Sequence, residues 1–361
     1  MSATPEAIIP VSRKTLRWLR QGRPTHLGWR RGASYAWNAF WFDVNAALQK
    51  RLTPETEPAL PANPVFILGL WRSGTTFAHE LLNACPGLTA PTTRQCMNAS
   101  TFMLTGRQAR NATVSRPMDA MEISQDSPQE DEFALLSLGI PTVYRAFLDP
   151  GRIEEQARLL SPDYWVSEAP SAWHGEWLAF LRAVQGQTEA GARLVIKSPG
   201  HSFRVKAIEG IFPESRYVWI TRSPAELLHS NRRMWMAMFK RYGMNGVDPQ
   251  RLDRFLLQAF EQAASCLDWL CGRMGADRLA VIDFSRLAAD PAAVIAATGQ
   301  GLGLGERPSL YRACETALRE RGGYRREQYR PGLLSAEEER ALAILRASQD
   351  RALASHGLTD R

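Results

Sequence analysis

A glycine-rich turn, GLWRSGTT at residues 69–76, has the composition of a loop that binds phosphate. Gly69 and Gly74 have the spacing G-x-x-x-x-G, and the apolar run before them reads as a buried strand. Such a turn directs backbone N–H groups and the positive end of the next helix at an anion. Nucleotide hydrolases continue this loop with lysine, but Thr75 stands there, and the cation inside the loop is Arg72. The loop therefore suits a donor whose transferred group carries less charge than a phosphoryl group, such as a sulfuryl group.

Short apolar segments separated by helical ones predict a parallel sheet covered on both faces. We expect strands at 64–69, 193–198, 216–221 and 279–284, helices at 75–84, 224–239 and 252–274, and few strands within 86–185. Ligands of such sheets bind beyond the carboxyl ends of the strands, so the loop, Lys197–His201 and Thr221–Arg222 should border one crevice. The predicted fold is α/β, a three-layer P-loop-like domain over residues 61–361 with a central parallel sheet flanked by helices.

Residues 1–60 read as a basic, Trp-rich helical extension followed by a Pro-rich linker. Through Arg51 the chain carries nine Lys or Arg and two acidic residues, with four Trp interleaved. One amphipathic helical face is formed by Ala33, Trp37, Phe40, Trp41, Val44 and Leu48. We expect the extension to pack on the main domain. Peripheral contact of residues 1–51 with an anionic membrane is the alternative that remains open, and nucleic acid is not an expected partner.

Composition places the 361-residue chain, with its net charge of +7, among ordinary globular proteins. The five cysteines lack the grouping of metal ligands, so we expect reduced thiols, a cytoplasmic location and no metal requirement. Neither a signal peptide nor an apolar run of about 18 residues is evident.

Several motifs resemble a known family. RSGTTF (72–77) is similar to the 5′-phosphosulfate loop of sulfotransferases that use 3′-phosphoadenosine 5′-phosphosulfate (PAPS). RYVWITRSPAELLHSNRRM (216–234) resembles the family's 3′-phosphate segment, with an Arg after a strand, a Pro dipeptide and a Ser eight residues past the Arg. RLVIKSPGH (193–201) and SPQEDEFAL (127–135) resemble two stretches of the bacterial branch. The resemblance covers roughly residues 61–340.

The resemblance implies a set of donor-binding residues and two catalytic cations. The donor-binding set is Arg72, Ser73, Gly74, Thr75, Thr76, Phe77, Arg222 and Ser230. Arg72 and Lys197 would stabilise charge on the sulfuryl group and the departing phosphate. Phe77 stands where relatives place an adenine-stacking Trp, although a Phe there could equally be a core residue.

The base that accepts the acceptor's proton is left open by the sequence. His201 lies two residues beyond the place where cytosolic relatives carry their histidine. Glu130 or Glu132 could serve if burial raised the carboxyl pKa, although an acidic run is also usual at an exposed helix start. His79 and His174 are further candidates.

The predicted function is sulfuryl transfer from PAPS to a hydroxyl of a hydrophobic small molecule or lipid. Segments 90–185 and 224–243 are rich in Met and aromatic residues, which could line an apolar pocket or form an ordinary core. Two alternatives remain: a P-loop kinase or NTPase using Asp283 to hold a metal, and a non-catalytic sulfotransferase-like binding protein. The oligomeric state is not encoded in these patterns.

Overall fold

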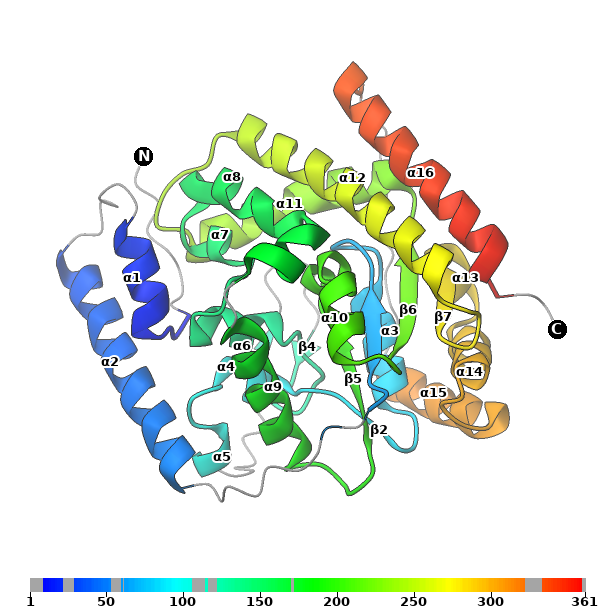
Figure 1. Ribbon diagram of the computed structural model, residues 1–361, viewed down its shortest axis with the longest axis horizontal. Helices are drawn as coiled ribbons and strands as arrows, with labels where there is room; N and C mark the ends of the chain where they lie inside the picture. Colours follow the sequence, from blue (N-terminus) through cyan, green and yellow to red (C-terminus); the bar gives the residue numbers. More distant parts are fainter. Residues whose placement is uncertain are drawn as a thin grey trace.

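The computed structural model describes residues 9–21, 29–52, 60, 62–105, 114–115, 122–169, 172–321 and 333–358 of the 361-residue chain. A five-stranded parallel sheet with the order β2-β5-β1-β6-β7 lies at its centre (Figure 1). The strands are β1 (Val65–Leu68), β2 (Leu88–Thr89), β5 (Arg193–Lys197), β6 (Arg216–Thr221) and β7 (Leu279–Asp283), and β3 (Val114–Ser115) pairs separately with β4 (Glu122–Ile123). The expected parallel α/β sheet is confirmed.

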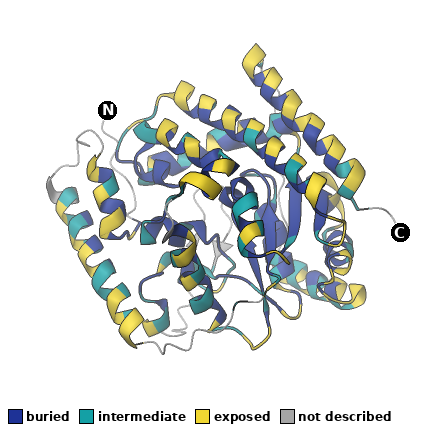
Figure 2. Cartoon of the chain, viewed as in Figure 1, coloured by how far each residue is buried: buried dark blue, intermediate teal, exposed yellow. Residues whose placement is uncertain are grey.

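Successive residues of each central strand enter different halves of the core, because side chains of a strand alternate between the two faces of a sheet. In β1, Phe66 and Leu68 belong to one buried cluster, whereas Val65 and Ile67 belong to the other. The strands are therefore buried on both faces (Figure 2). This double burial explains why they read as continuous apolar runs in the sequence.

Helices cover both faces of the sheet (Figure 1). The cluster containing Val65 is completed by residues from α3 (Thr75–Asn83), α13 (Phe284–Ala289), α14 (Pro291–Gly301) and α15 (Arg307–Arg321). The larger cluster draws on α6 (Glu132–Leu138), α9 (Ala172–Gln185), α10 (Val205–Ile211), α11 (Pro224–Tyr242), α12 (Pro249–Arg273) and α16 (Ala336–His356). The shorter helices are α4 (Thr93–Met97), α5 (Phe102–Thr105), α7 (Arg145–Leu148), α8 (Ile153–Gln156), the 3₁₀ turns η1 (Pro150–Arg152), η2 (Ala157–Leu160) and η4 (Pro199–Phe203), and the π-turn η3 (Tyr164–Glu168).

The N-terminal extension contains two helices, α1 (Arg13–Gln21) and α2 (Trp29–Leu52), which pack against each other and against the main domain. In α2 the buried residues are Tyr35, Ala39 and Phe42. The extension packs on the domain as expected, but the stripe containing Trp37 and Trp41 is turned outward, with these residues 63% and 44% exposed. Periodicity identifies an apolar face without identifying its partner. No helix in the described part of the chain is long and apolar enough to cross a bilayer.

Candidate active site

The glycine-rich turn between β1 and α3 has a tightly constrained backbone. Gly69 has a φ of 137°, and Gly74, which precedes α3, has a φ of 104°. A Cβ on Gly74 would lie 2.3 Å from Phe284 Cδ2, so glycine is required there. Arg72 has a φ of 68°, a conformation that is uncommon for non-glycine residues and recurs at functional sites. The turn leads directly into a nine-residue helix, the arrangement that binds anions.

One buried hydroxyl of this turn is also suited to binding an anion. Ser73 is fully buried, and its Oγ has no hydrogen-bond partner among the described residues. A buried polar group without a partner costs about 1–3 kcal/mol. A phosphate held in the turn would accept a hydrogen bond from this hydroxyl and remove that cost, so the residues present fit a phosphate-bearing ligand.

Two side chains of the second phosphate motif lie directly against the turn. Arg72 Nε donates to Ser230 Oγ at 3.1 Å, and Arg222 Nη1 donates to the main-chain oxygen of Arg72 at 2.9 Å. β6 brings Arg222 to this edge because it pairs in parallel with β1, and α11 then carries Ser230 past the turn. Arg222 also forms an ion pair with Glu226 at 2.9 Å. The two motifs, far apart in sequence, meet at one edge of the sheet.

A pocket of about 320 Å³ opens beside Arg222 at the carboxyl ends of β6 and β7. The Arg222 guanidinium carbon lies 4.8 Å from the centre of the Phe284 ring, and this ring also covers Gly74. Helix α16 adds Arg346 and Gln349 to the lining. Turn and pocket therefore share Phe284 as a wall, and the pocket can accommodate a further part of a ligand bound at the turn.

Lys197, at the end of β5, connects the loop helix with the acidic segment. Its Nζ donates to Thr76 Oγ1 at 3.1 Å and to Glu130 Oε1 at 2.6 Å. The other Glu130 oxygen accepts a hydrogen bond from the Tyr144 hydroxyl, which in turn accepts one from Trp71 Nε1 at 3.3 Å. Burial, together with the nearby Glu130 charge, raises the pKa of Tyr144 well above its ordinary value, so the phenol remains a proton donor. One polar chain thus runs from the start of α3 to Glu130.

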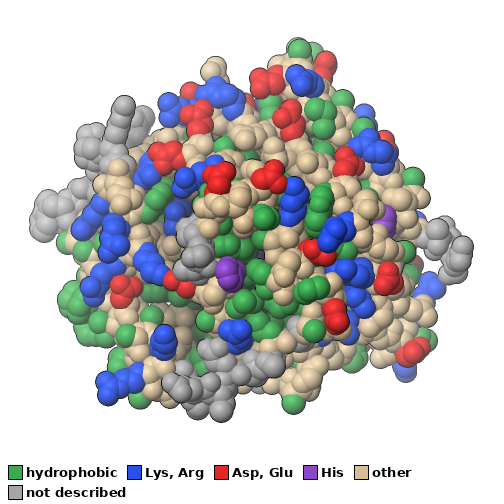
Figure 3. Space-filling model, in the orientation of Figure 1, with side chains coloured by type: hydrophobic (Ala, Val, Ile, Leu, Met, Phe, Trp, Pro, Cys, Tyr) green, Lys and Arg blue, Asp and Glu red, His purple; other side chains and the backbone are tan. Residues whose placement is uncertain are grey.

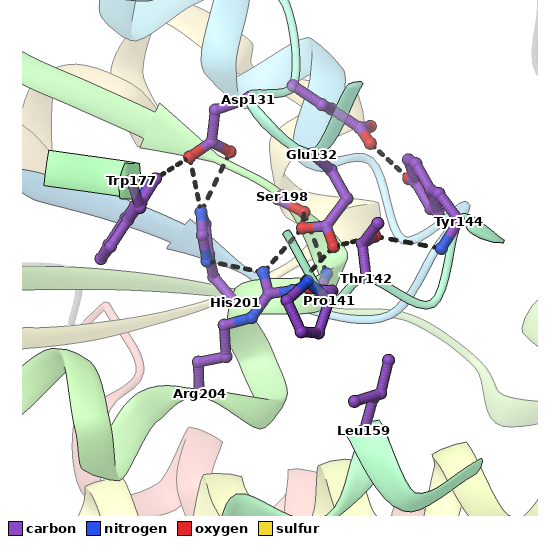
Figure 4. Close-up of polar contacts among 12 residues, drawn as sticks. Asp131, Glu132, Pro141, Thr142, Tyr144, Leu159, Trp177, Ser198, His201 and Arg204 are labelled. Carbon is purple, nitrogen blue, oxygen red and sulfur yellow. Dashed lines mark hydrogen bonds and ion pairs between the residues drawn. The ribbon is translucent and has the colours of Figure 1, made fainter. Parts of the chain in front are cut away.

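Glu132 is held in a buried ion pair (Figure 4). Arg204 Nη1 and Nη2 donate to its two oxygens at 2.7 and 2.8 Å. The hydroxyls of Ser198 and Thr142 each donate to one oxygen as well. Burial alone would raise the pKa of Glu132, but the charge and hydrogen bonds of Arg204 outweigh it and lower the pKa to about 2. The carboxylate is fully engaged by donors and stays ionised.

His201 belongs to the same buried network (Figure 4). It is inaccessible to solvent, and its Nε2 lies 2.9 Å from Asp131 Oδ2. Trp177 Nε1 donates to the same Asp131 oxygen at 2.7 Å. The other imidazole nitrogen, Nδ1, lies 3.2 Å from Arg204 Nη1. Both ring nitrogens are therefore engaged by neighbouring side chains of the core.

The remaining histidine candidates lie elsewhere. His79 is fully buried on α3, with Nε2 3.2 Å from the Val195 oxygen. Burial, reinforced by the Lys197 charge, lowers the pKa of His79 to about 3. His174 is exposed on α9. Of the residues proposed as base, Glu130 is the one hydrogen-bonded to Lys197 at the loop.

Phe77 and most of the predicted acceptor-lining aromatics are core residues. Phe77 is 6% exposed and packs in the cluster with Val65 and α15. The buried aromatic residues of segments 90–185 and 224–243 include Tyr144, Trp165, Trp173, Trp177 and Trp235. Their positions agree with the ordinary-core alternative, so these residues give no evidence about an acceptor.

Three residues of this network were missed at the sequence level, namely Tyr144, Asp131 and Arg204. Asp131 lies inside the acidic run, but nothing in the run distinguishes it from its neighbours. Arg204 follows His201 by one turn of η4, which is a weak signal for shared contacts. Tyr144 is one of many aromatic residues in segment 90–185, and nothing in the sequence pairs its hydroxyl with Glu130.

Asp283, the carboxylate that the kinase or NTPase alternative requires, ends β7, which lies two strands from β1 in the sheet. Its Oδ1 accepts a hydrogen bond from Ser285 N at 2.7 Å and caps α13. Among the described residues, no group of three or more His, Cys, Asp or Glu is arranged to hold a metal ion. The carboxylate acts here as a helix cap.

The fold and the loop define an α/β protein whose turn at the end of β1 is suited to a phosphate-bearing ligand. The model of the sulfotransferase family matches residues 64–306, and the chain belongs to this family. The omega-hydroxy-beta-dihydromenaquinone-9 sulfotransferase Stf3, from Mycobacterium bovis and from Mycobacterium tuberculosis, is 27% identical over 283 residues, which cover 77% of this chain and 72% of Stf3.

Solved structures of mycobacterial sulfotransferases share the fold. Sulfotransferase STF1 from Mycobacterium tuberculosis H37Rv has a TM-score of 0.65 and 17% identity, covering 93% of this chain and 92% of STF1. STF9 from Mycobacterium avium has a TM-score of 0.66 and 18% identity, covering 92% of this chain and 86% of STF9. Both comparisons support the expected α/β fold of a sulfotransferase.

Proposed function

We propose that the protein transfers a sulfuryl group from PAPS to a hydroxyl group of a hydrophobic acceptor. The observation that carries this proposal is the pair of hydrogen bonds that join Arg72 to Ser230 and Arg222 to the turn. They bring the turn at the start of α3 next to a strand-end arginine, so that each could hold one anionic group of a single ligand. A nucleotide with phosphates at both the 5′ and 3′ positions needs two such sites.

In this proposal the turn holds the 5′-phosphate. The N–H groups of residues 72–76 and the hydroxyls of Ser73, Thr75 and Thr76 would hydrogen-bond to it, while Arg72 balances its charge. Arg222 and Ser230 would bind the 3′-phosphate. The adenosine would extend toward the pocket beside Phe284, whose ring is one of its walls.

Transfer is proposed to be an in-line displacement at sulfur. The acceptor oxygen forms a bond to sulfur as the bond from sulfur to the 5′-phosphate oxygen breaks, and the acceptor proton passes to Glu130. Lys197, which lies between Thr76 and Glu130, would stabilise charge on the sulfuryl and bridging oxygens. Glu130 is favoured because its partner, Lys197, also contacts Thr76 at the start of the loop helix, whereas His201 and Glu132 are paired with Asp131 and Arg204.

A hydrophobic acceptor is supported by Stf3, whose name specifies a hydroxylated menaquinone as its substrate. At 27% identity the acceptor of this chain can differ within the same chemical class. A screen of hydroxyl-bearing lipids and phenols with radiolabelled PAPS would identify it.

Donor binding can be tested by calorimetry with 3′-phosphoadenosine 5′-phosphate, the nucleotide product. Arg222→Ala should weaken binding by about a hundredfold, because it removes a charge-assisted contact to phosphate. Arg216→Ala is a matched control, since Arg216 begins the same strand at its opposite end. The proposal fails if the wild type does not bind this nucleotide, or if both variants weaken binding equally.

A further inference from the structure

The outward face of α2 carries an exposed apolar patch, which we call the α2 patch: Trp37, Phe40, Trp41, Leu48 and Leu52. Their exposed fractions are 63, 43, 44, 44 and 66%, respectively. The ring centres of Trp37 and Trp41 lie 5.6 Å apart, and those of Phe40 and Trp41 lie 5.5 Å apart. Exposed apolar side chains are ordinary when scattered, but a contiguous aromatic patch indicates a surface that is covered by a partner.

The rest of α2 shows that this exposure is a fixed feature of the fold. Tyr35, Ala39 and Phe42 anchor the opposite face in the core. Gln49 holds the C-terminal half through hydrogen bonds with the backbone of Ala99 and Met103. The helix therefore cannot bury the patch by rotating unless it gives up these contacts.

Positive charge surrounds the α2 patch. The helices α1 and α2 contain eight Lys or Arg and a single acidic residue, Asp43. Asp43 forms an ion pair with Arg13 at 3.4 Å. Arg13 also lies 5.2 Å from the centre of the Phe40 ring. Arg17, Arg20, Lys50 and Arg51 are exposed. Figure 3 shows Lys and Arg gathered with hydrophobic side chains on the side of the molecule formed by these helices.

We infer that the α2 patch docks the protein on the surface of an anionic lipid bilayer. Tryptophan favours the interfacial region of a membrane, where its ring is buried and its N–H remains hydrated. Basic residues beside an apolar stripe add attraction to anionic headgroups. Helix α2 has 24 residues and is therefore about 36 Å long, which allows extended contact parallel to a membrane surface. A nucleic acid would leave the apolar stripe without a partner, and a second copy would bring two positively charged faces together.

The extension also contacts α6, the helix that begins within the acidic segment of the site. Helix α1 contacts α6, and Ser12 N donates to the Ser137 oxygen at 2.7 Å. Vesicle binding needs neither donor nor acceptor, so the docking surface can be tested separately from sulfuryl transfer.

The test is cosedimentation of the full chain with phosphatidylcholine vesicles prepared with and without phosphatidylglycerol. The wild type should bind the anionic vesicles, and added salt should weaken this binding. Trp37→Ala/Trp41→Ala should weaken it at least about tenfold, because two large rings no longer leave water. Arg17→Gln/Arg20→Gln should weaken binding to anionic vesicles specifically. All four replaced side chains are exposed or partly exposed on helices, so thermal unfolding should be unchanged.

Matched controls come from other surfaces. Val166→Ala/Tyr311→Ala removes exposed apolar groups elsewhere, and Arg312→Gln/Arg319→Gln removes two exposed charges of α15. Both should bind vesicles like the wild type. The inference is overturned if the wild type ignores anionic vesicles, or if the controls lose as much binding as the patch variants. It is also overturned if light scattering shows that Trp37→Ala/Trp41→Ala converts a dimer to a monomer while vesicle binding persists, because a second copy then covers the patch.

Discussion

Glu130 and Glu132 are separated by one residue in the sequence, but the structure predicts different consequences for their replacement by glutamine. In Glu130→Gln, the amide oxygen can still accept from Lys197 and the amide N–H₂ can donate to the Tyr144 oxygen, so hydrogen bonds to both neighbours survive although the buried Lys197 loses its opposite charge. In the wild type, each Glu132 oxygen accepts a hydrogen bond from Arg204 and another from a hydroxyl. In Glu132→Gln, the amide N–H₂ would therefore face donors in either orientation of the side chain.

The cost at Glu132 follows from its buried charge. Removing one partner of a buried ion pair typically destabilises a protein by about 3–5 kcal/mol. The pKa gives a separate measure: a fall from 4.5 to about 2 corresponds to about 3 kcal/mol of stability. Because the folded pKa is the lower one, this contribution is complete above about pH 4.5 and is lost as the pH falls toward 2. Glu132→Gln should therefore lack this contribution, and its unfolding free energy should fall less steeply than that of the wild type in that window.

The cost at Glu130 should appear in turnover. A general base contributes about 10²–10⁴-fold to rate, so Glu130→Gln should lower kcat by that factor with the best acceptor from the lipid screen. Binding of the nucleotide product should stay within about threefold of the wild type, because the loop contacts are preserved. A Glu132→Gln variant that keeps both the stability and the activity of the wild type should not occur.

The assays are urea unfolding at pH 7 and at a series of acidic pH values, calorimetry with the nucleotide product, and transfer of radiolabelled sulfuryl. Full activity in Glu130→Gln would refute its role as base. A Glu132→Gln protein as stable as the wild type at pH 7 would refute the importance of the buried pair.

Two further predictions concern the loop and its helix. Gly74→Ala should lower the unfolding free energy by about 1–3 kcal/mol and weaken nucleotide binding. Adding Phe284→Ala should restore stability only partly, because the 2.3 Å contact disappears but the φ of 104° remains unfavourable for alanine. Full recovery of stability would contradict the argument from the backbone conformation. His79, with its pKa lowered from 6.5 to about 3 by burial, should make unfolding free energy fall as the pH drops below 6.5, because the unfolded chain takes up a proton that the folded one does not. His79→Gln should flatten this slope by up to about 1.4 kcal/mol per pH unit between pH 6.5 and 5, and an unchanged slope in urea titrations would argue against it.

The sheet and the loop could be predicted from the sequence because their signals are local. Apolar runs mark strands that are buried on both faces, and glycine spacing marks a turn whose backbone only glycine can adopt. The rule that ligands lie beyond parallel strand ends then brought Arg72, Lys197 and Arg222 to one edge of the sheet. The structure places all three there.

What could not be predicted depends on which partner a side chain meets. The periodicity of α2 identified the face containing Trp37, but the domain packs against Tyr35 and Ala39 instead. His201 stood at a position that favours a catalytic histidine, but its environment depends on Asp131 and Trp177, which lie 70 and 24 residues away in the sequence. Such long-range pairings leave no local pattern.

The three consecutive acidic residues make the same point about the site itself. Asp131 is fixed by His201 and Trp177, and Glu132 by Arg204 and Ser198, so the backbone of this segment is anchored on both sides of its charges. Glu130 precedes these anchors, and its carboxylate contacts Lys197. Three of the partners, Lys197, Ser198 and His201, come from the end of β5 and the turn that follows it. The positions of Glu130, the proposed base, and of Lys197, the second cation, therefore both depend on the end of β5. A shift of that strand end would move both side chains together relative to the loop.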